Sequence, residues 1–355
     1  MPRASRLTKV FTPSFADEDG TNAQNLTVKE VVARLDPERF HVAMFYDRRP
    51  DPRIAARPNT ALWPWRSRGN TLRTLVRIAH DVPDIYFFPR EGPLEARFYT
   101  LRRWLRWRTR VVTYMVSGGL ERRGPAPGQL LNLREASAVA GNCATITQLL
   151  RGMGFAATTI HDGVDRRFYF PPQERPVRDH RSLVALCAGS FRPYKRFDLV
   201  VRQAAQWPQV EFRIAGHGEE EESCRKLARD LGCGNVRFLG HLGQGALGEE
   251  MRHADIFLFP SELEGHPQVL LQAAASGLPC VAMNSYRPDA IVDGETGFLA
   301  GSAEELAEKF AILVRDAGRR LAMSQAALRH AAEFDWDKAT RLWAEAFERA
   351  MEERP

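Results

Sequence analysis

The loop after the apolar run 257–260 carries the residues best suited to chemistry at one point. Proline stops the run, so it predicts a buried strand that ends in a loop. The loop places Glu264 and His266 before a helix over 268–276, which Gly277 ends. A helix amino terminus at the carboxyl end of a strand suits a phosphate or a negatively polarised oxygen. The alternative is an ordinary strand–helix–strand unit with a surface acid.

A basic turn follows another predicted strand, Leu183 to Ala188. It starts at Gly189 and packs Arg192, Lys195 and Arg196 before a helix. A diphosphate needs cations and backbone N–H donors in such a place, although a solvated basic turn has the same pattern. A second turn, 216–218, reads Gly-His-Gly after the strand 210–215. Its small residues either let a ligand approach the backbone or simply make a tight turn.

Strands alternate with helices along the whole chain, which predicts parallel sheets covered on both faces. The stretch 169–180 contains three prolines and no periodicity, so we place the domain boundary there. The expected parts are an amino-terminal acceptor-binding domain over 1–172, a donor-binding domain over 180–335 and a terminal helix over 336–355. We expect 47–69 to be irregular and a helix to run from 92 to 108.

Composition narrows the class of protein. The 355 residues contain no run of 18 apolar residues, and the first 15 have no apolar core of a signal peptide. The five cysteines are scattered without metal-ligand spacing, so we expect reduced thiols, no metal site and a cytoplasmic protein. Residues 1–175 are basic and the remainder is acidic, which supports two domains with different partners.

The ordered motifs of the second half resemble the nucleotide-sugar-binding domain of family-4 retaining glycosyltransferases. They are Gly189-x5-Lys195, Gly216-x-Gly218, 238–240 (FLG), 254–261 (ADIFLFPS), Glu264-Gly265 with Gln272, 275–279 (ASGLP) and 293–298 (DGETGF). The resemblance implies the GT-B fold, in which two Rossmann-like domains face each other across a cleft and a carboxyl-terminal helix crosses back to the first domain. It also implies bacterial cell-envelope or polysaccharide biosynthesis.

The family's chemistry assigns roles to these residues. A sugar leaves its nucleoside diphosphate, UDP or GDP, and joins an acceptor hydroxyl with retained configuration, without metal or cofactor. Lys195 matches the family's lysine that stabilises the leaving diphosphate, and Glu264 matches the acid beside the donor sugar. Arg192 or Arg196 replaces the family's arginine, and we favour Arg192. The remaining donor-binding positions implied by the resemblance are Gly189, Ser190, Arg196, Gly216, His217, Gly218, Leu239, Gly265, His266, Pro267, Gln268, Val269 and Gln272.

Three departures from the family pattern keep other functions open. Ser190 stands where the family has an arginine, and Gln272 replaces its second glutamate. The stretch 113–119 lacks the histidine that many members carry. A nucleotide-binding or catalytically impaired pseudo-glycosyltransferase on the same fold is therefore the alternative hypothesis. An epimerase on this fold is a third, and it needs an acid pair that the first half does not offer.

Two segments of the first half are candidates for contact with the acceptor or the phosphates. The loop Gly20, Thr21, Asn22 precedes a helix, so it either closes over the ligand or caps that helix. Ser117 and Gly118 follow a strand and offer backbone contacts. The acceptor itself, whether a glycan, a lipid-linked molecule or a small molecule, is not specified by these residues.

The segment Arg97–Arg110 interleaves arginines with aromatic and apolar residues. Phe98, Leu101, Trp104 and Leu105 share one face of the expected helix. Such a helix is suited to an anionic bilayer, which predicts peripheral contact at the inner face of a membrane. The alternatives are a core helix with solvated arginines and a nucleic-acid surface; no nucleic-acid-binding motif supports the latter, so we expect none.

Overall fold

The computed structural model describes residues 6–18, 23–65, 70–116, 120–173 and 183–352, and they form two compact units. Unit 1 comprises residues 1–162 and 336–355, and unit 2 comprises 163–335. Residues 163–172 therefore belong with unit 2, although we expected them in the first domain. The reason is local, because Val164 and Tyr169 pack in the core of unit 2.

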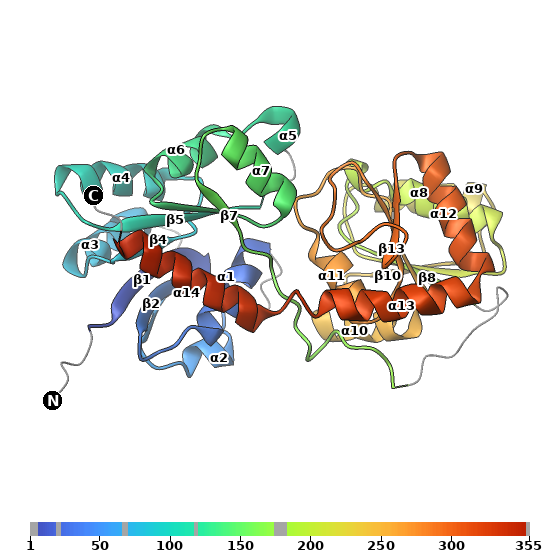
Figure 1. Ribbon diagram of the computed structural model, residues 1–355, viewed down its shortest axis with the longest axis horizontal. Helices are drawn as coiled ribbons and strands as arrows, with labels where there is room; N and C mark the ends of the chain where they lie inside the picture. Colours follow the sequence, from blue (N-terminus) through green and yellow to red (C-terminus); the bar gives the residue numbers. More distant parts are fainter. Residues whose placement is uncertain (1–5, 19–22, 66–69, 117–119, 174–182, 353–355) are drawn as a thin grey trace. The chain divides into compact units, whose positions relative to one another are not determined.

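Unit 1 is built on a seven-stranded parallel sheet with the order β3-β2-β1-β4-β5-β6-β7 (Figure 1). Its strands are β1 (Thr8–Phe15), β2 (Phe40–Tyr46), β3 (Thr60–Pro64), β4 (Ile85–Phe87), β5 (Arg110–Met115), β6 (Ala138–Gly141) and β7 (Ala157–Thr159). Its helices are α1 (Ala23–Arg34), α2 (Pro52–Ala55), α3 (Asn70–His80), α4 (Pro93–Trp104), α5 (Leu120–Arg123), α6 (Pro127–Glu135), α7 (Ala144–Gly152) and α14 (Trp336–Glu352).

Alternation along the strands gives this sheet two apolar faces. Val10 packs in one core with α1, α2 and α14, whereas the next residue, Phe11, packs in another with α3 and α4. Trp343 of α14 is fully buried, with its ring 4.8 Å from Phe87 and 4.9 Å from Tyr114. The terminal helix is thus part of the core of unit 1, because its large aromatic side chains cover one face of the sheet.

Three sequence expectations for unit 1 were wrong. The stretch 47–69 was expected to be irregular, but its described part holds α2 and the edge strand β3. Strand β6 was missed because its run, Ala-Val-Ala-Gly, is short and lacks large apolar side chains. Helix α4 ends at Trp104 and not at Arg108, because Arg106 has a positive φ of 53° and turns the chain toward β5.

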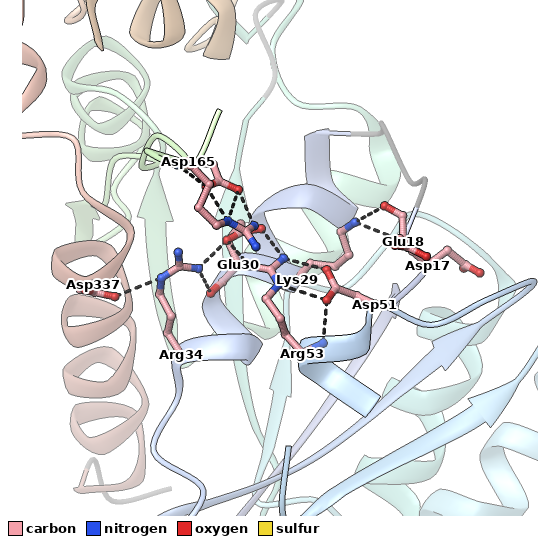
Figure 2. Close-up of polar contacts among 10 residues, drawn as sticks. Asp17, Glu18, Lys29, Glu30, Arg34, Asp51, Arg53, Asp165 and Asp337 are labelled. Carbon is pink, nitrogen blue, oxygen red and sulfur yellow. Dashed lines mark hydrogen bonds and ion pairs between the residues drawn. The ribbon is translucent and has the colours of Figure 1, made fainter. Parts of the chain in front are cut away.

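A charged network joins α1, α2 and α14 within unit 1 (Figure 2). The carboxylate of Glu30, which is 2% exposed, receives two hydrogen bonds from Arg53, of 2.9 and 2.7 Å, and pairs also with Arg34. Arg34 in turn pairs with Asp337 of α14 at 3.0 Å. Hydrogen bonds to Glu30 and Asp51 raise the pKa of Arg53. A buried carboxylate held by two guanidinium groups is a structural element here, since loss of a partner leaves a buried charge.

Unit 2 is built on a six-stranded parallel sheet with the order β10-β9-β8-β11-β12-β13. Its strands are β8 (Val184–Ala188), β9 (Glu211–Ala215), β10 (Val236–Gly240), β11 (Ile256–Phe259), β12 (Cys280–Met283) and β13 (Gly297–Ala300). Its helices are α8 (Phe197–Gln206), α9 (Glu221–Asp230), α10 (Gln244–His253), α11 (Gln268–Ala275), α12 (Ala303–Arg315) and α13 (Ala317–Ala331), with a 3-10 turn η1 (Pro193–Lys195).

The central strands of unit 2 are buried along their whole length. Every residue of β8 and β11 is buried, as expected for apolar strands covered by helices on both faces. The chain runs from β8 outward to β10 and then returns to place β11 on the other side of β8. The strand order therefore reverses between β8 and β11, and ligands bind at such a point in open α/β sheets.

Candidate functional site

The carboxyl ends of β8 and β11 bring the two sequence-predicted loops together at the switch point of unit 2. Gly189 leaves β8 with a φ of +155°, and the η1 turn and Arg196 then lead into α8. The loop after β11 leads into α11. The amide of Glu262 donates to the carbonyl of Tyr194 at 2.8 Å, so the backbones of the two loops are joined directly.

Lys195 and Glu264, one from each loop, form an ion pair between Nζ and Oε1. Both side chains are largely buried, with 11% and 14% exposed. Ser261 Oγ donates to the same Oε1 at 2.6 Å, and the lysine ammonium lies 5.0 Å from the ring centroid of Phe259. The ammonium is thus fixed by a carboxylate on one side and an aromatic face on the other, which holds a positive charge at the sheet edge.

The two arginines of the basic turn, Arg192 and Arg196, differ in their contacts and exposure. Arg196 occupies the left-handed region, donates to Asp198 at 3.0 and 3.2 Å, and pairs with Glu262 across the loops. Its hydrogen bonds to Asp198 raise its pKa. Arg192 is exposed, and its side chain makes one long contact among the described residues, of 3.4 Å with Glu219. Arg196 therefore braces the two loops, whereas the charge of Arg192 is available to a ligand.

The Gly216-His217-Gly218 turn packs against the loop that follows β8. A Cβ on Gly216 would lie 1.8 Å from the carbonyl oxygen of Gly189, and one on Gly218 would lie 2.6 Å from that of Phe191. Phe191 N also donates to His217 O at 2.9 Å. The glycines are required by this close approach of two backbones, which gives a structural reason for the motif beside the proposed ligand contact.

The end of the β11 loop leads into the amino terminus of α11. Pro267 is the N-cap residue and has no polar side chain, so the N-cap residue itself makes no side-chain hydrogen bond to the first-turn N–H groups. Gln268 Nε2 is buried and makes no hydrogen bond in the described part of the chain. Gln272 lies one turn further along α11 and is 9% exposed. This terminus can accept a negatively charged or hydroxyl-bearing group from the site.

The other predicted donor-binding residues occupy mixed environments. His266 is buried with its ring 5.7 Å from that of Phe334, so it packs inside unit 2. Leu239, on β10, and Val269, on α11, are half-buried and pack against the core. Ser190 is exposed and Gly265 is buried. Gly20, Thr21, Asn22, Ser117 and Gly118 lie outside the described residues, so their predicted roles stay predictions.

Tyr286 belongs to the surroundings of this site, although sequence reasoning missed it. It is 5% exposed, and its hydroxyl makes no hydrogen bond among the described residues. Burial and the nearby Glu264 carboxylate raise its pKa well above the ordinary value. Tyr286 lies after β12, in a stretch with no glycine or charge pattern, so no signal in the sequence marks it.

The cysteine nearest the site is not set up as a nucleophile. Burial raises the pKa of the Cys187 thiol, and the positive charge of Lys195 opposes this only in part. A thiol kept protonated is inert toward electrophiles. Among the residues that the structure describes, no group of three or more His, Cys, Asp or Glu could hold a metal ion.

Most of unit 2 resembles a known family. Residues 172–330 match the family described as glycosyl transferases group 1. The predicted resemblance is therefore confirmed. Similar curated proteins include the D-inositol 3-phosphate glycosyltransferases of Streptomyces avermitilis (31% identical over 218 residues) and Mycobacterium tuberculosis (33% over 210). These alignments cover 54% and 55% of this chain but 47% and 44% of the relatives, so the chain spans about half their length.

Solved structures confirm the predicted GT-B fold class. Sucrose-phosphate synthase of Thermosynechococcus elongatus has a TM-score of 0.79 at 17% identity, with 97% of this chain and 98% of that chain covered. HepE of Anabaena, solved with UDP and glucose, has a TM-score of 0.76 at 18% identity, with 97% and 100% covered. At this identity the likeness shows the fold, namely an α/β protein with two parallel sheets.

Proposed function

We propose that this protein is a retaining glycosyltransferase that moves a sugar from a nucleoside-diphosphate sugar to an acceptor hydroxyl. The Lys195–Glu264 pair, at the switch point of a unit that matches group 1 glycosyl transferases, carries the proposal. A fixed cation and an acid side by side suit the two ends of such a donor. The cation faces the departing diphosphate, and the acid faces the sugar hydroxyls.

Electrostatic stabilisation of the leaving group is the main catalytic effect in this mechanism. The diphosphate gains negative charge as the bond to the sugar breaks, and Lys195, Arg192 and the first-turn N–H groups of α8 or α11 neutralise it. We propose that these protein charges suffice without a metal or another cofactor. UDP or GDP is the proposed nucleotide, and the UDP bound in HepE supports the first.

Glu264 and Gln272 are assigned to the sugar and ribose side of the donor. When donor binds, its phosphates compete with the Glu264 carboxylate for the Lys195 ammonium, which frees Glu264 to accept hydrogen bonds from sugar hydroxyls. Gln272 offers an amide to the ribose hydroxyls, without the charge of a carboxylate. The leaving phosphate then takes the proton of the acceptor hydroxyl.

Titration calorimetry with UDP and GDP tests the donor site. We expect one of them to bind the wild-type protein with a Kd of about 1 μM to 1 mM, the range of ordinary enzyme–substrate affinity. Wild type that binds a nucleotide but neither hydrolyses nor transfers from its sugar conjugates would favour the pseudo-glycosyltransferase. A folded sample that binds neither nucleotide would overturn the proposal.

We also propose that unit 1 contacts a membrane, through a different face from the one expected. Phe98 is fully buried and Leu101 is half-buried, so the expected apolar face of 97–110 belongs partly to the core. Trp104 is 78% exposed and Leu105 is 43% exposed. Helix α3, which packs beside α4, adds Leu72, 68% exposed, and Val76, 60% exposed.

The exposed apolar residues belong to two helices, α3 and α4, that contact each other. Tyr99 and Arg103 of α4 hydrogen-bond to α6, so Trp104 projects from the side of α4 away from α6. Exposed arginines flank the four apolar residues and form no ion pair in the described part of the chain: Arg73, Arg97, Arg106 and Arg108. Cations around exposed apolar side chains suit an anionic bilayer. A cytoplasmic location at the inner face of the membrane belongs to this proposal.

Vesicle sedimentation tests the membrane contact. Wild type should bind phosphatidylglycerol vesicles and not phosphatidylcholine vesicles, and Leu72→Gln with Trp104→Gln should weaken binding about tenfold or more, because two apolar side chains lose burial. Leu321→Gln is the matched control, since Leu321 is 45% exposed on α13 of unit 2. Equal binding by the double variant, or no binding by wild type, would contradict the proposal. Within the described residues, no helix is long and apolar enough to span a membrane.

A further inference from the structure

The sheet of unit 1 has a switch point of its own, between β1 and β4. The chain runs from β1 outward to β3 and then places β4 on the other side of β1. Three side chains meet near the carboxyl ends of these strands. Phe15 ends β1, Trp65 directly follows β3, and Arg90 lies three residues after β4. By the same rule as in unit 2, this is where unit 1 would receive a ligand.

Arg90 carries a half-buried positive charge that forms no ion pair among the described residues. Its Nη2 donates to the neutral amide oxygen of Asn25, and its Cζ lies 5.0 Å from the ring centroid of Phe15. Its Nε is buried and has no hydrogen-bond partner, and among the described residues no carboxylate forms an ion pair with it. Burial lowers the pKa of this guanidinium, and the nearby Glu95 carboxylate opposes this only in part. Glu95 acts on this cation as a nearby charge, but the hydrogen bond of the guanidinium goes to a neutral amide, so an anionic ligand can add a charged hydrogen bond.

The nearest acid is already engaged in holding the loop. Glu95 Oε1 accepts hydrogen bonds from Tyr86 Oη at 3.0 Å and from the backbone amide of Arg90 at 3.1 Å. Asn132 Nδ2 donates to the carbonyl of Arg90 at 3.0 Å. The backbone of Arg90 is thus fixed from both sides, and its side chain is oriented by Asn25 and Phe15. Such a preorganised guanidinium loses little freedom when it binds a bidentate anion.

An aromatic surface adjoins this charge. The rings of Phe15 and Trp65 lie 5.3 Å apart, Phe45 packs against both, and the Trp65 indole is 37% exposed. The exposed Trp65 ring offers an apolar face to a sugar or cyclitol ring, and the Arg90 guanidinium offers two parallel N–H donors to the charged substituent of that ring.

We infer that Arg90 and Trp65 bind the acceptor, and that this acceptor is a ring compound bearing an anionic group, either a phosphate or a carboxylate. The inference rests on the proposed glycosyl transfer, because it assigns the acceptor of that reaction. It adds to that proposal a residue that selects the acceptor by charge. Neutral acceptors of the same size leave the guanidinium without its partner, which disfavours them.

Titration calorimetry with three probes tests this site: glucose 6-phosphate, glucuronate and neutral glucose, each added with saturating UDP so that the diphosphate position of unit 2 is filled. Wild type should bind at least one anionic probe more tightly than glucose, and the preferred probe distinguishes phosphate from carboxylate. Arg90→Gln should weaken that binding about tenfold or more, as expected for a lost charged hydrogen bond. Arg90→Lys keeps the positive charge but loses the two parallel N–H donors of the guanidinium, so its affinity for the probe should lie between those of wild type and Arg90→Gln.

The controls separate this inference from the proposed function. Arg341→Gln removes one exposed arginine from α14 and should bind all probes as wild type does. UDP affinity and the thermal unfolding midpoint should be unchanged in Arg90→Gln. Unchanged binding of the anionic probes by Arg90→Gln, or wild type that fails to prefer them over glucose, overturns the inference while UDP binding still supports the donor site. Loss of UDP binding in wild type instead removes the proposed function.

Discussion

Replacement of Lys195 by alanine is expected to lower the rate of sugar transfer by about 10²-fold to 10³-fold, the usual effect of removing one fixed group that stabilises developing charge. The ammonium is the only side-chain cation of the basic turn that is both largely buried and paired with the acid of the facing loop. Burial makes its charge effective, because water screens it less than it screens the exposed Arg192. Initial rates with a UDP-sugar and an acceptor found by screening measure this effect.

The matched control for this variant is Lys226→Ala. Lys226 is exposed on α9, and its replacement by alanine also removes one positive charge from unit 2. Its transfer rate should equal that of wild type. Lys195→Ala should remain folded, because Glu264 keeps the hydrogen bond from Ser261 at 2.6 Å. Near-normal turnover by a folded Lys195→Ala protein would show that the diphosphate is stabilised elsewhere.

Gly216→Ala is expected to destabilise the protein by about 2–6 kcal/mol, the sum of a disfavoured backbone conformation and an overpacked contact. The added Cβ would lie 1.8 Å from the Gly189 carbonyl oxygen, and the φ of +137° is itself unsuited to alanine. Because the two loops must separate, the donor site should open as well. Urea denaturation followed by circular dichroism measures the stability, and UDP titration measures the site.

Replacement of a second glycine, Gly232, separates backbone strain from overpacking as causes of the stability lost in Gly216→Ala. Gly232 also has a positive φ, of +67°, but a Cβ added there would have nothing within 4 Å of it. Gly232→Ala should therefore cost only about 1–2 kcal/mol, from backbone strain alone, and should leave nucleotide binding intact. If Gly216→Ala were no more destabilising than Gly232→Ala, the close approach of the two loops would be wrong.

The sequence alone determined the class of fold and the resemblance of unit 2 to a known family. Alternation of apolar runs with helical segments predicted parallel sheets, because strands covered on both faces must be apolar along their length, as β8 and β11 are. The order of the glycine, lysine and acidic motifs predicted the family of unit 2. Short strands such as β6 escaped prediction, since four small residues carry too little periodicity.

Only the tertiary structure decided which partner each cation of the basic turn has. In the sequence Arg192, Lys195 and Arg196 are equivalent cations in one turn. In the fold Lys195 meets Glu264, Arg196 braces Glu262 and Arg192 stays exposed, because each side chain leaves the turn in a different direction. Arg90 had no motif at all. Its significance comes from the burial of its charge and from the strand order that places it beside Phe15, which are properties of contacts between residues far apart in the chain.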